Sequence, residues 1–149
     1  MKLKVPPVAL VFVTGGIIWV IDKITDLTYS FEGKEWLDKG LLFLCVLVLV
    51  FALAAFRKLK TTVDPMNPSK ATKLVTIGIY HVTRNPMYLS MLLLLAGFAS
   101  KLGNPLCLIP VILFVWYMNQ FQIKPEEEAL QEIFGEDYTN YCKKVRRWI

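Results

Sequence analysis

Residues 72–90 read TKLVTIGIYHVTRNPMYLS, and this stretch decides how the rest of the chain is organised. Its first half gathers turn, aromatic, basic and amide residues, and its second half starts an uncharged apolar run. Asn85 followed by Pro86 predicts a helix start, because Asn is a favoured N-cap and Pro at the first helical position loses no hydrogen bond. We expect Tyr80, His81, Arg84 and Asn85 to lie where a membrane helix meets the cytosolic surface.

A second polar signal follows a later apolar run. Pro125, Glu126, Glu127 and Glu128 stand just after it and predict the start of another helix. Two polar clusters at the same end of two neighbouring apolar helices indicate one composite site.

The composition is that of a membrane protein. The 149 residues are 55% hydrophobic and only 19% charged, and the mean hydropathy is +0.47, which is too apolar for an ordinary soluble domain of this size. We expect a single domain over residues 1–149. Three cysteines at no metal-like spacing predict reduced thiols and no metal site, and the glycines form neither GxGxxG nor a P-loop.

Four apolar runs predict an all-α membrane bundle with four spans, at about residues 5–21, 41–56, 87–100 and 106–123. A signal peptide is the alternative for 5–21, but the run is long and no small-x-small cleavage site follows it. We expect a polar loop at 22–39, and a tight connection at 101–105 that makes the last two runs an antiparallel hairpin. The third run is short for a span, which favours a thinned or tilted arrangement.

The basic residues set the expected orientation. With the N-terminus in the cytosol and four crossings, only four of the 17 basic residues fall outside: Lys23, Lys34, Lys39 and Lys101. This positive-inside bias predicts both termini and both polar clusters on the cytosolic side.

The tail, residues 124–149, is expected to form a cytosolic helical cap. Its apolar residues recur at helical spacing, at Leu130, Phe134, Tyr138, Tyr141, Val145 and Trp148. Gly135 is expected to break the tail into two short helices. The basic run at its end predicts a helix lying at an anionic headgroup surface, with Lys143, Lys144, Arg146, Arg147 and Trp148.

Each polar feature also has a plain structural explanation. The Asn85-Pro86 pair is a common helix cap, and Arg84 has the character of a snorkelling anchor. Glu126 to Glu128 suit the first turn of any helix, and Tyr80 and Tyr88 suit an interfacial aromatic belt. Only their coincidence on one membrane face favours a site.

Several separated motifs carry a family resemblance. They are Leu74-Val75-Thr76 with Gly78 and Tyr80, then Arg84-Asn85-Pro86-Met87-Tyr88, and then Glu126-Glu127 with Leu130, Phe134-Gly135, Tyr138 and Tyr141. Their order and spacing over roughly Lys70 to Val145 resemble the isoprenylcysteine carboxyl methyltransferase and phospholipid methyltransferase superfamily of integral membrane enzymes. Its pattern runs LVTxGxY, RHPxY, a helical hairpin and EExxLxxxFGxxYxxY.

The resemblance implies S-adenosylmethionine bound within the membrane domain. Carried over by position, the cofactor-binding residues would be Thr72, Lys73, Leu74, Val75, Tyr80, Asn85, Pro86, Met87, Tyr88, Glu126 and Glu127. The chemistry is compatible, because aromatic faces stabilise a sulfonium and a carboxylate can pair with the cofactor's ammonium. Helix N-terminal amides near Met87 suit its carboxylate or ribose oxygens.

Four positions depart from the family pattern. Asn85 replaces the His of RHPxY, so hydrogen bonding is retained but a titrating role is not. Ser90 stands for a common Gly, and Thr72 for a common His. Gln122 is nearest to the position where prenylcysteine enzymes carry an arginine for the substrate carboxylate, which weakens a prenylcysteine substrate specifically.

We expect methyl transfer to a lipophilic acceptor within the bilayer: an isoprenylcysteine-like carboxylate, a phospholipid amine or another small lipophile. Arg84 is the candidate for orienting the acceptor, and His81 for taking a proton from an amine or thiol. Expected partners are the bilayer and the acceptor, with no nucleic acid. The alternatives are a related sterol-reductase type of enzyme with a nicotinamide cofactor, and a non-enzymatic membrane scaffold or transporter subunit.

Overall fold

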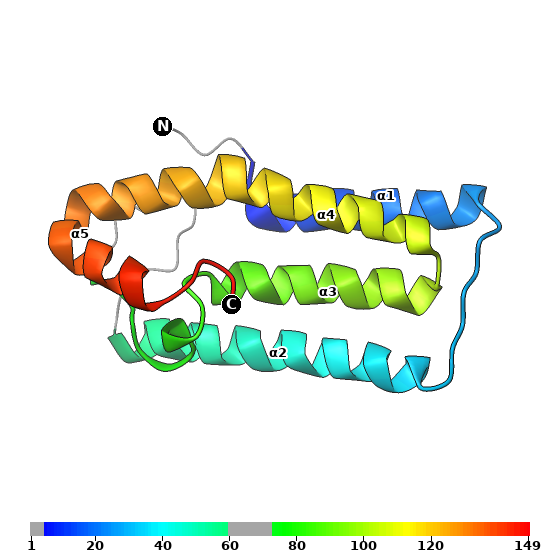
Figure 1. Cartoon of the computed structure of the whole chain (residues 1–149), viewed down its shortest axis with the longest axis horizontal. Coiled ribbons are helices and arrows are strands. Elements are labelled where there is room, and N and C mark those ends of the chain that lie inside the picture. The colour runs from blue at the N-terminus through cyan, green and yellow to red at the C-terminus, as the bar shows by residue number, and fades with distance from the viewer. Residues whose placement is uncertain (1–4, 60–72) are drawn as a thin grey trace.

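The computed structural model describes residues 5–59 and 73–149, and within them it is all-α (Figure 1). The long helices run in alternating directions, so the start of α3 and the start of α5 lie at the same end of the bundle (Figure 1). The elements in order are α1 (Pro7–Ile24), α2 (Lys34–Leu59), the 3-10 turn η2 (Gly78–His81), α3 (Pro86–Leu102), the 3-10 turn η3 (Pro105–Cys107), α4 (Leu108–Tyr117), the π-helical segment η4 (Met118–Ile123) and α5 (Lys124–Lys144).

Helix α3 is the centre of the packing. It lies between α2 and α4, and α1 packs against both α3 and α4 (Figure 1). Residues from α1, α3 and the α4–η4 run build the main core, which contains Ile18, Tyr88, Leu95, Ala99, Cys107, Val111, Phe114, Met118 and Ile123. Side chains on the opposite faces of α1 and α2 are exposed although apolar, as expected for surfaces that meet lipid, for example Phe12, Trp19, Phe43, Val46 and Phe51.

Three helical stretches among the described residues are long and apolar enough to cross a membrane: Pro7–Ile24, Lys34–Leu59 and the continuous run Pro105–Lys144. They contain the first, second and fourth of the predicted spans. The third forms α3, which is apolar but has only 17 residues. Its shortness agrees with the expectation from the sequence.

The connection between α3 and η3 depends on Gly103. This residue ends α3 in the left-handed conformation with φ of 77°. Its carbonyl accepts a hydrogen bond of 2.7 Å from the Tyr29 N–H, and a Cβ at this position would lie 2.6 Å from the Tyr29 carbonyl oxygen. The predicted antiparallel hairpin of α3 and α4 is therefore confirmed, and the loop after α1 packs onto its turn.

The prediction of a polar loop over residues 22–39 is wrong at both ends, because α1 continues to Ile24 and α2 already begins at Lys34. Two i,i+4 ion pairs accompany this first turn, Lys34 with Asp38 at 3.6 Å and Lys39 with Glu35 at 3.5 Å. Glu35 also lies in the first turn, where the helix dipole favours an acid. Local charge spacing thus extends the helix beyond its apolar run.

The expected new helix start at Pro125 is also wrong. The chain stays helical from η3 through α5, and the π-helical segment η4 lies directly before the proline. Proline has no N–H and crowds the preceding turn. A π turn absorbs one extra residue, so the helix passes Pro125 without ending.

Gly135 breaks the tail as predicted. Its φ of 52° and ψ of −121° are not helical, and α5 folds back on itself there (Figure 1). The interpretation of the final basic run as part of a surface helix holds for Lys143 and Lys144, which are helical and exposed, and is wrong after them. The helix ends at Lys144, Val145 is extended, and Arg147 and Trp148 turn inward, where Arg147 finds a carboxylate partner in Glu127.

Candidate functional site

The contact between the two polar clusters is made by Tyr88, Gln122 and Glu126, which we call the tyrosine cluster. Tyr88 Oη donates a hydrogen bond of 2.7 Å to Glu126 Oε2, and Gln122 Nε2 donates one of 3.2 Å to Tyr88 Oη. Tyr88 is 5% exposed and Gln122 is 1% exposed. The first turn of α3 is thus joined to η4 and α5, as the sequence predicted for a composite site.

Glu126 is the member of this cluster whose surroundings bring its protonation into the neutral pH range. Burial raises its pKa to about 7, the hydrogen bond from Tyr88 opposes that rise, and the neighbouring Glu127 charge adds to it. Glu126 has no cationic partner within residues 5–59 and 73–149. A half-buried carboxylate with one hydrogen-bond donor and no countercharge among the described residues is suited to receive a cation.

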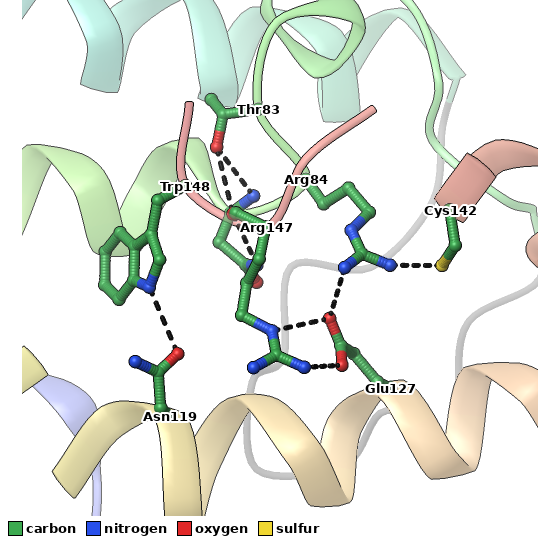
Figure 2. A network of polar contacts seen from close by, with 8 residues as sticks. Thr83, Arg84, Asn119, Glu127, Cys142, Arg147 and Trp148 are labelled. Carbon is green, nitrogen blue, oxygen red and sulfur yellow. Dashed lines mark hydrogen bonds and ion pairs between the residues drawn. The ribbon is translucent and has the colours of Figure 1, made fainter. Parts of the chain in front are cut away.

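Glu127 faces another direction and is fully engaged. Consecutive residues of a helix project about 100° apart, so the two acids serve different partners. Glu127 Oε1 lies 3.1 Å from a terminal nitrogen of Arg84, and its two oxygens accept bonds of 3.1 and 2.6 Å from the Arg147 guanidinium. Figure 2 shows Arg147 and Arg84 both reaching this carboxylate, and Arg84 also contacting Cys142 Sγ. We call Arg84, Glu127, Cys142 and Arg147 the arginine cluster.

Arg84 is held tightly by these contacts. Its side chain is 13% exposed, and its Nε is buried without a hydrogen-bond acceptor among the described residues. An unmet buried donor costs about 1–3 kcal/mol. Arg84 Nε is therefore a position where an acceptor atom of a ligand would be stabilised.

Asn85 is at the start of α3, as predicted, but its side chain does not cap the helix. Asn85 Nδ2 instead donates a hydrogen bond of 3.0 Å to the carbonyl oxygen of Arg147. The same oxygen accepts from Thr83 Oγ1 at 3.3 Å. The prediction of a capping side chain was wrong because it considered only local partners, whereas the partner here lies 62 residues away.

The segment before α3 forms the wall beside these clusters. Val75 and Tyr80 pack with Ala52 and Ala55 of α2, and Met87 lies against the same group. Tyr141 Oη donates a bond of 2.7 Å to the Tyr80 carbonyl, and burial raises the Tyr80 pKa, with the Glu126 charge adding to the rise. Leu74 packs instead on the tail core of Tyr138, Tyr141 and Val145.

Of the remaining predicted site residues, the structure describes Lys73, His81 and Pro86. Lys73 and His81 are exposed at the surface. Thr72 lies outside the described residues. Pro86 is buried at the start of α3 and shapes the first turn.

The sequence analysis assigned the four residues that follow α5 to a surface helix and missed their contacts with the start of α3. Residues 145–148 fold back across the start of α3, and we call them the C-terminal strap. Arg146 O accepts a bond of 3.0 Å from Arg84 N, and Trp148 Nε1 donates one of 3.1 Å to Asn119 Oδ1. The only signal in the sequence was the helical spacing of Val145 and Trp148, which indicated buried positions without giving their partners.

Known proteins share the motifs from which this site is built. The model of the phospholipid methyltransferase family matches residues 40–137, about two thirds of the chain, including the motifs at 74–88 and the last motif up to residue 137. The chain belongs to the phospholipid methyltransferase family. The resemblance deduced from the motifs is thereby confirmed, and the family is one of integral membrane methyltransferases that use S-adenosylmethionine.

Individual relatives agree with this membership. A probable protein-S-isoprenylcysteine O-methyltransferase of Oryza sativa subsp. indica is 31% identical over 144 residues, which cover 85% of this chain and 75% of the relative. The protein-S-isoprenylcysteine O-methyltransferase of Xenopus laevis is 39% identical over 77 residues, covering 52% of this chain and 27% of that protein. An uncharacterized protein of Haemophilus influenzae is 49% identical over 63 residues, 42% of this chain and all of the relative.

Membership of the phospholipid methyltransferase family fits the apolar helices described above. The protein is an integral membrane protein with apolar spans. The matched region ends at residue 137, so the C-terminal strap lies beyond it.

Proposed function

We propose that this protein transfers a methyl group from S-adenosylmethionine to a lipophilic acceptor that reaches the site from the bilayer. The observation that carries the proposal is the Tyr88–Glu126 hydrogen bond of 2.7 Å. It unites two separated family motifs at one end of the bundle and leaves a carboxylate without a countercharge in the described part of the chain.

The residues present fit the cofactor's charges. The cofactor's sulfonium and ammonium are cations. Either can pair with the Glu126 carboxylate or lie against the aromatic faces of Tyr80 and Tyr88. The first N–H groups of an α-helix have no acceptor within the helix, so those of Met87 and Tyr88 at the start of α3 suit carboxylate or hydroxyl oxygens. We propose that the cofactor is held by residues from these segments: Thr72, Lys73, Leu74, Val75, Tyr80, Asn85, Pro86, Met87, Tyr88 and Glu126. Glu127 is proposed to contribute indirectly, because it forms an ion pair with Arg84.

When bound, the cofactor supplies an electrophilic methyl group. The protein's part is to orient the acceptor in line with that methyl and to exclude water. We propose that Arg84 orients the acceptor, since Glu127 fixes its guanidinium and its buried Nε lacks an acceptor among the described residues. An amine or thiol acceptor would lose a proton, and His81 at the exposed rim is proposed to take it.

The orientation proposed is four membrane crossings with both termini in the cytosol. It makes α3 a short or tilted span and places α5 as a cap on the cytosolic side. The support is the positive-inside bias, which leaves only Lys23, Lys34, Lys39 and Lys101 outside.

The deciding experiment is equilibrium binding to the purified full-length protein in detergent. Calorimetry compares S-adenosylmethionine with NADPH, and labelled methyl transfer is then screened over lipid extracts. Binding of S-adenosylmethionine with labelling of a lipid supports the proposal. Binding of NADPH alone points to the reductase alternative, and binding of neither points to a non-enzymatic membrane protein.

A further inference from the structure

The C-terminal strap touches both halves of the candidate site. Its main chain holds the α3 side, because Arg146 O accepts from Arg84 N at 3.0 Å and Arg147 O accepts from Asn85 Nδ2 at 3.0 Å. Two consecutive residues of the family motif therefore each donate one hydrogen bond to a segment outside the matched region.

The side chains of the strap hold the other half. Arg147 forms a two-point contact with Glu127 on α5, and Trp148 Nε1 bonds to Asn119 Oδ1 on η4. Trp148 also packs against the main core. In Figure 2 the strap lies between the start of α3 and the helix that carries Asn119 and Glu127, and the side chains of Arg147 and Trp148 point toward that helix.

The charges of the arginine cluster explain why Arg147 matters. Glu127 is shared by two guanidinium groups, and Arg147 binds both of its oxygens whereas Arg84 reaches only Oε1. Two-point contacts between arginine and a carboxylate fix the geometry of both partners. Arg147 therefore limits how far Glu127 can move toward Arg84, and so fixes the position of Arg84.

We infer that the C-terminal strap is a positioning element of the site and that Arg147 is a positioning residue, acting through Glu127 on Arg84 and through its own carbonyl on Asn85. The inference rests on the proposed function in one respect: the expected effect of Arg147 on the affinity for the methyl donor assumes that the protein binds this donor. The anchoring of the strap by Arg147 does not depend on that function, and the alkylation rate of Cys142 measures it separately.

The test uses full-length protein in detergent with three variants. Arg147→Gln removes the two-point contact, and Arg147→Lys retains the charge with a single donor group. Arg146→Gln is the matched control, since Arg146 is the adjacent basic residue, its side chain is exposed and its carbonyl contact is retained. Calorimetry with S-adenosylmethionine gives the affinity and the fraction of competent sites. Alkylation of Cys142 by N-ethylmaleimide, followed on its peptide by mass spectrometry, reports release of the strap.

We expect Arg147→Gln to weaken donor binding roughly tenfold or more at unchanged stoichiometry, as for the loss of a charge-assisted contact. Arg147→Lys should recover part of the affinity, and Arg146→Gln should match the wild type. Cys142 is half-buried and contacts Arg84, so it should be alkylated several times faster in Arg147→Gln alone, because release of the strap frees Arg84.

Two results overturn the inference. Equal affinity and equal Cys142 alkylation in Arg147→Gln and Arg146→Gln would mean that Arg147 does not anchor the strap. Fewer competent sites with an unchanged dissociation constant would reduce Arg147 to a folding role. If the wild type binds no donor, the proposed function fails instead, and the alkylation rates alone decide the anchoring: faster labelling of Arg147→Gln supports it, and equal labelling contradicts it.

Discussion

Tyr88 and Glu126 lie 38 residues apart in the sequence and are joined by a hydrogen bond of 2.7 Å. This bond makes the position of the carboxylate on α5 depend on the first turn of α3. Gln122 supports it from η4 by donating to the same hydroxyl oxygen. A hydroxyl that donates to one group and accepts from another is fixed in direction, so Tyr88 presents the carboxylate in one orientation.

The first prediction concerns the charge of Glu126. Glu126→Gln removes the carboxylate that is proposed to pair with the cofactor's cation, and such a charged hydrogen bond contributes about 1.5–3 kcal/mol. Calorimetry should show binding of S-adenosylmethionine weakened by roughly ten- to a hundredfold. Glu128→Gln is the matched control, because Glu128 lies on the same helical turn and is exposed. Unchanged affinity in a folded Glu126→Gln protein would make Glu126 merely an acid of an early helical turn.

The raised pKa of Glu126 predicts a pH dependence of donor binding. Burial raises that pKa to about 7, so the carboxyl is mostly protonated in the free protein below pH 7. A cation favours the ionised form, and binding must then release a proton. The dissociation constant should therefore rise as pH falls from 7 toward 5.5, by up to about tenfold per unit.

The measurement is calorimetry at pH 5.5, 6.5 and 7.5 in buffers of two ionisation enthalpies, which also counts the protons released. Glu126→Gln should lose the dependence together with the proton release. A flat profile in the wild type would mean that no cation meets Glu126.

Gly103 gives a prediction on stability that does not depend on function. Gly103→Ala places a Cβ on a residue with φ of 77° and within 2.6 Å of the Tyr29 carbonyl oxygen. The conformation alone costs about 1–2 kcal/mol, and the contact adds to it. The melting temperature in detergent should fall. Gly40→Ala is the control, since Gly40 is helical and a Cβ there meets open space. Its melting temperature should be unchanged or higher, because alanine favours a helix more than glycine does. Equal melting temperatures for the two variants would contradict this account of the turn.

The sequence predicted the helices and the meeting of the two motif clusters because both follow from local patterns. Apolar runs set the spans, and the motif order placed Tyr88 near Glu126. The C-terminal strap was not predictable in this way. Its hydrogen bonds join residues 20 to 64 positions apart, such as Arg147 with Glu127 and Thr83 with Arg147, and no periodic pattern encodes them. The early start of α2 was missed for a different reason. The spans were predicted from apolar residues alone, so the i,i+4 charge pairs between Lys34 and Lys39 were not counted as helical signals.

Topology gives the next prediction. The positive-inside bias places residue 32 outside and residue 140 in the cytosol. Both Glu32 and Asn140 are exposed, so each tolerates a cysteine. An impermeant maleimide applied to sealed right-side-out vesicles should label Glu32→Cys and leave Asn140→Cys unlabelled until the membrane is opened. Peptide mass spectrometry separates these sites from the native cysteines. Labelling of both from the same side would reject the arrangement with four crossings.

The last prediction concerns the acceptor. Gln122 stands where prenylcysteine enzymes are expected to place a carboxylate-binding arginine, and it is 1% exposed and bonded to Tyr88. Arg84 is the nearest substitute in the sequence motif, but Glu127 already engages it at 3.1 Å. A substrate carboxylate would therefore be buried with poor compensation. We predict that a farnesylated cysteine analogue is a poor acceptor and that an uncharged or amine-bearing lipid is a better one.

The measurement is transfer of labelled methyl to both acceptor types by the wild type, Gln122→Arg and Gln120→Arg. Gln120 is exposed and two residues away, so its variant adds the same charge outside the site. Gln122→Arg should raise transfer to the farnesylcysteine carboxylate relative to the lipid, because a buried guanidinium can pair with it. If the wild type methylates that carboxylate efficiently and Gln122→Arg gains nothing over Gln120→Arg, Gln122 does not set the acceptor class. The protein would then act on prenylcysteine like its named relatives in Oryza sativa and Xenopus laevis.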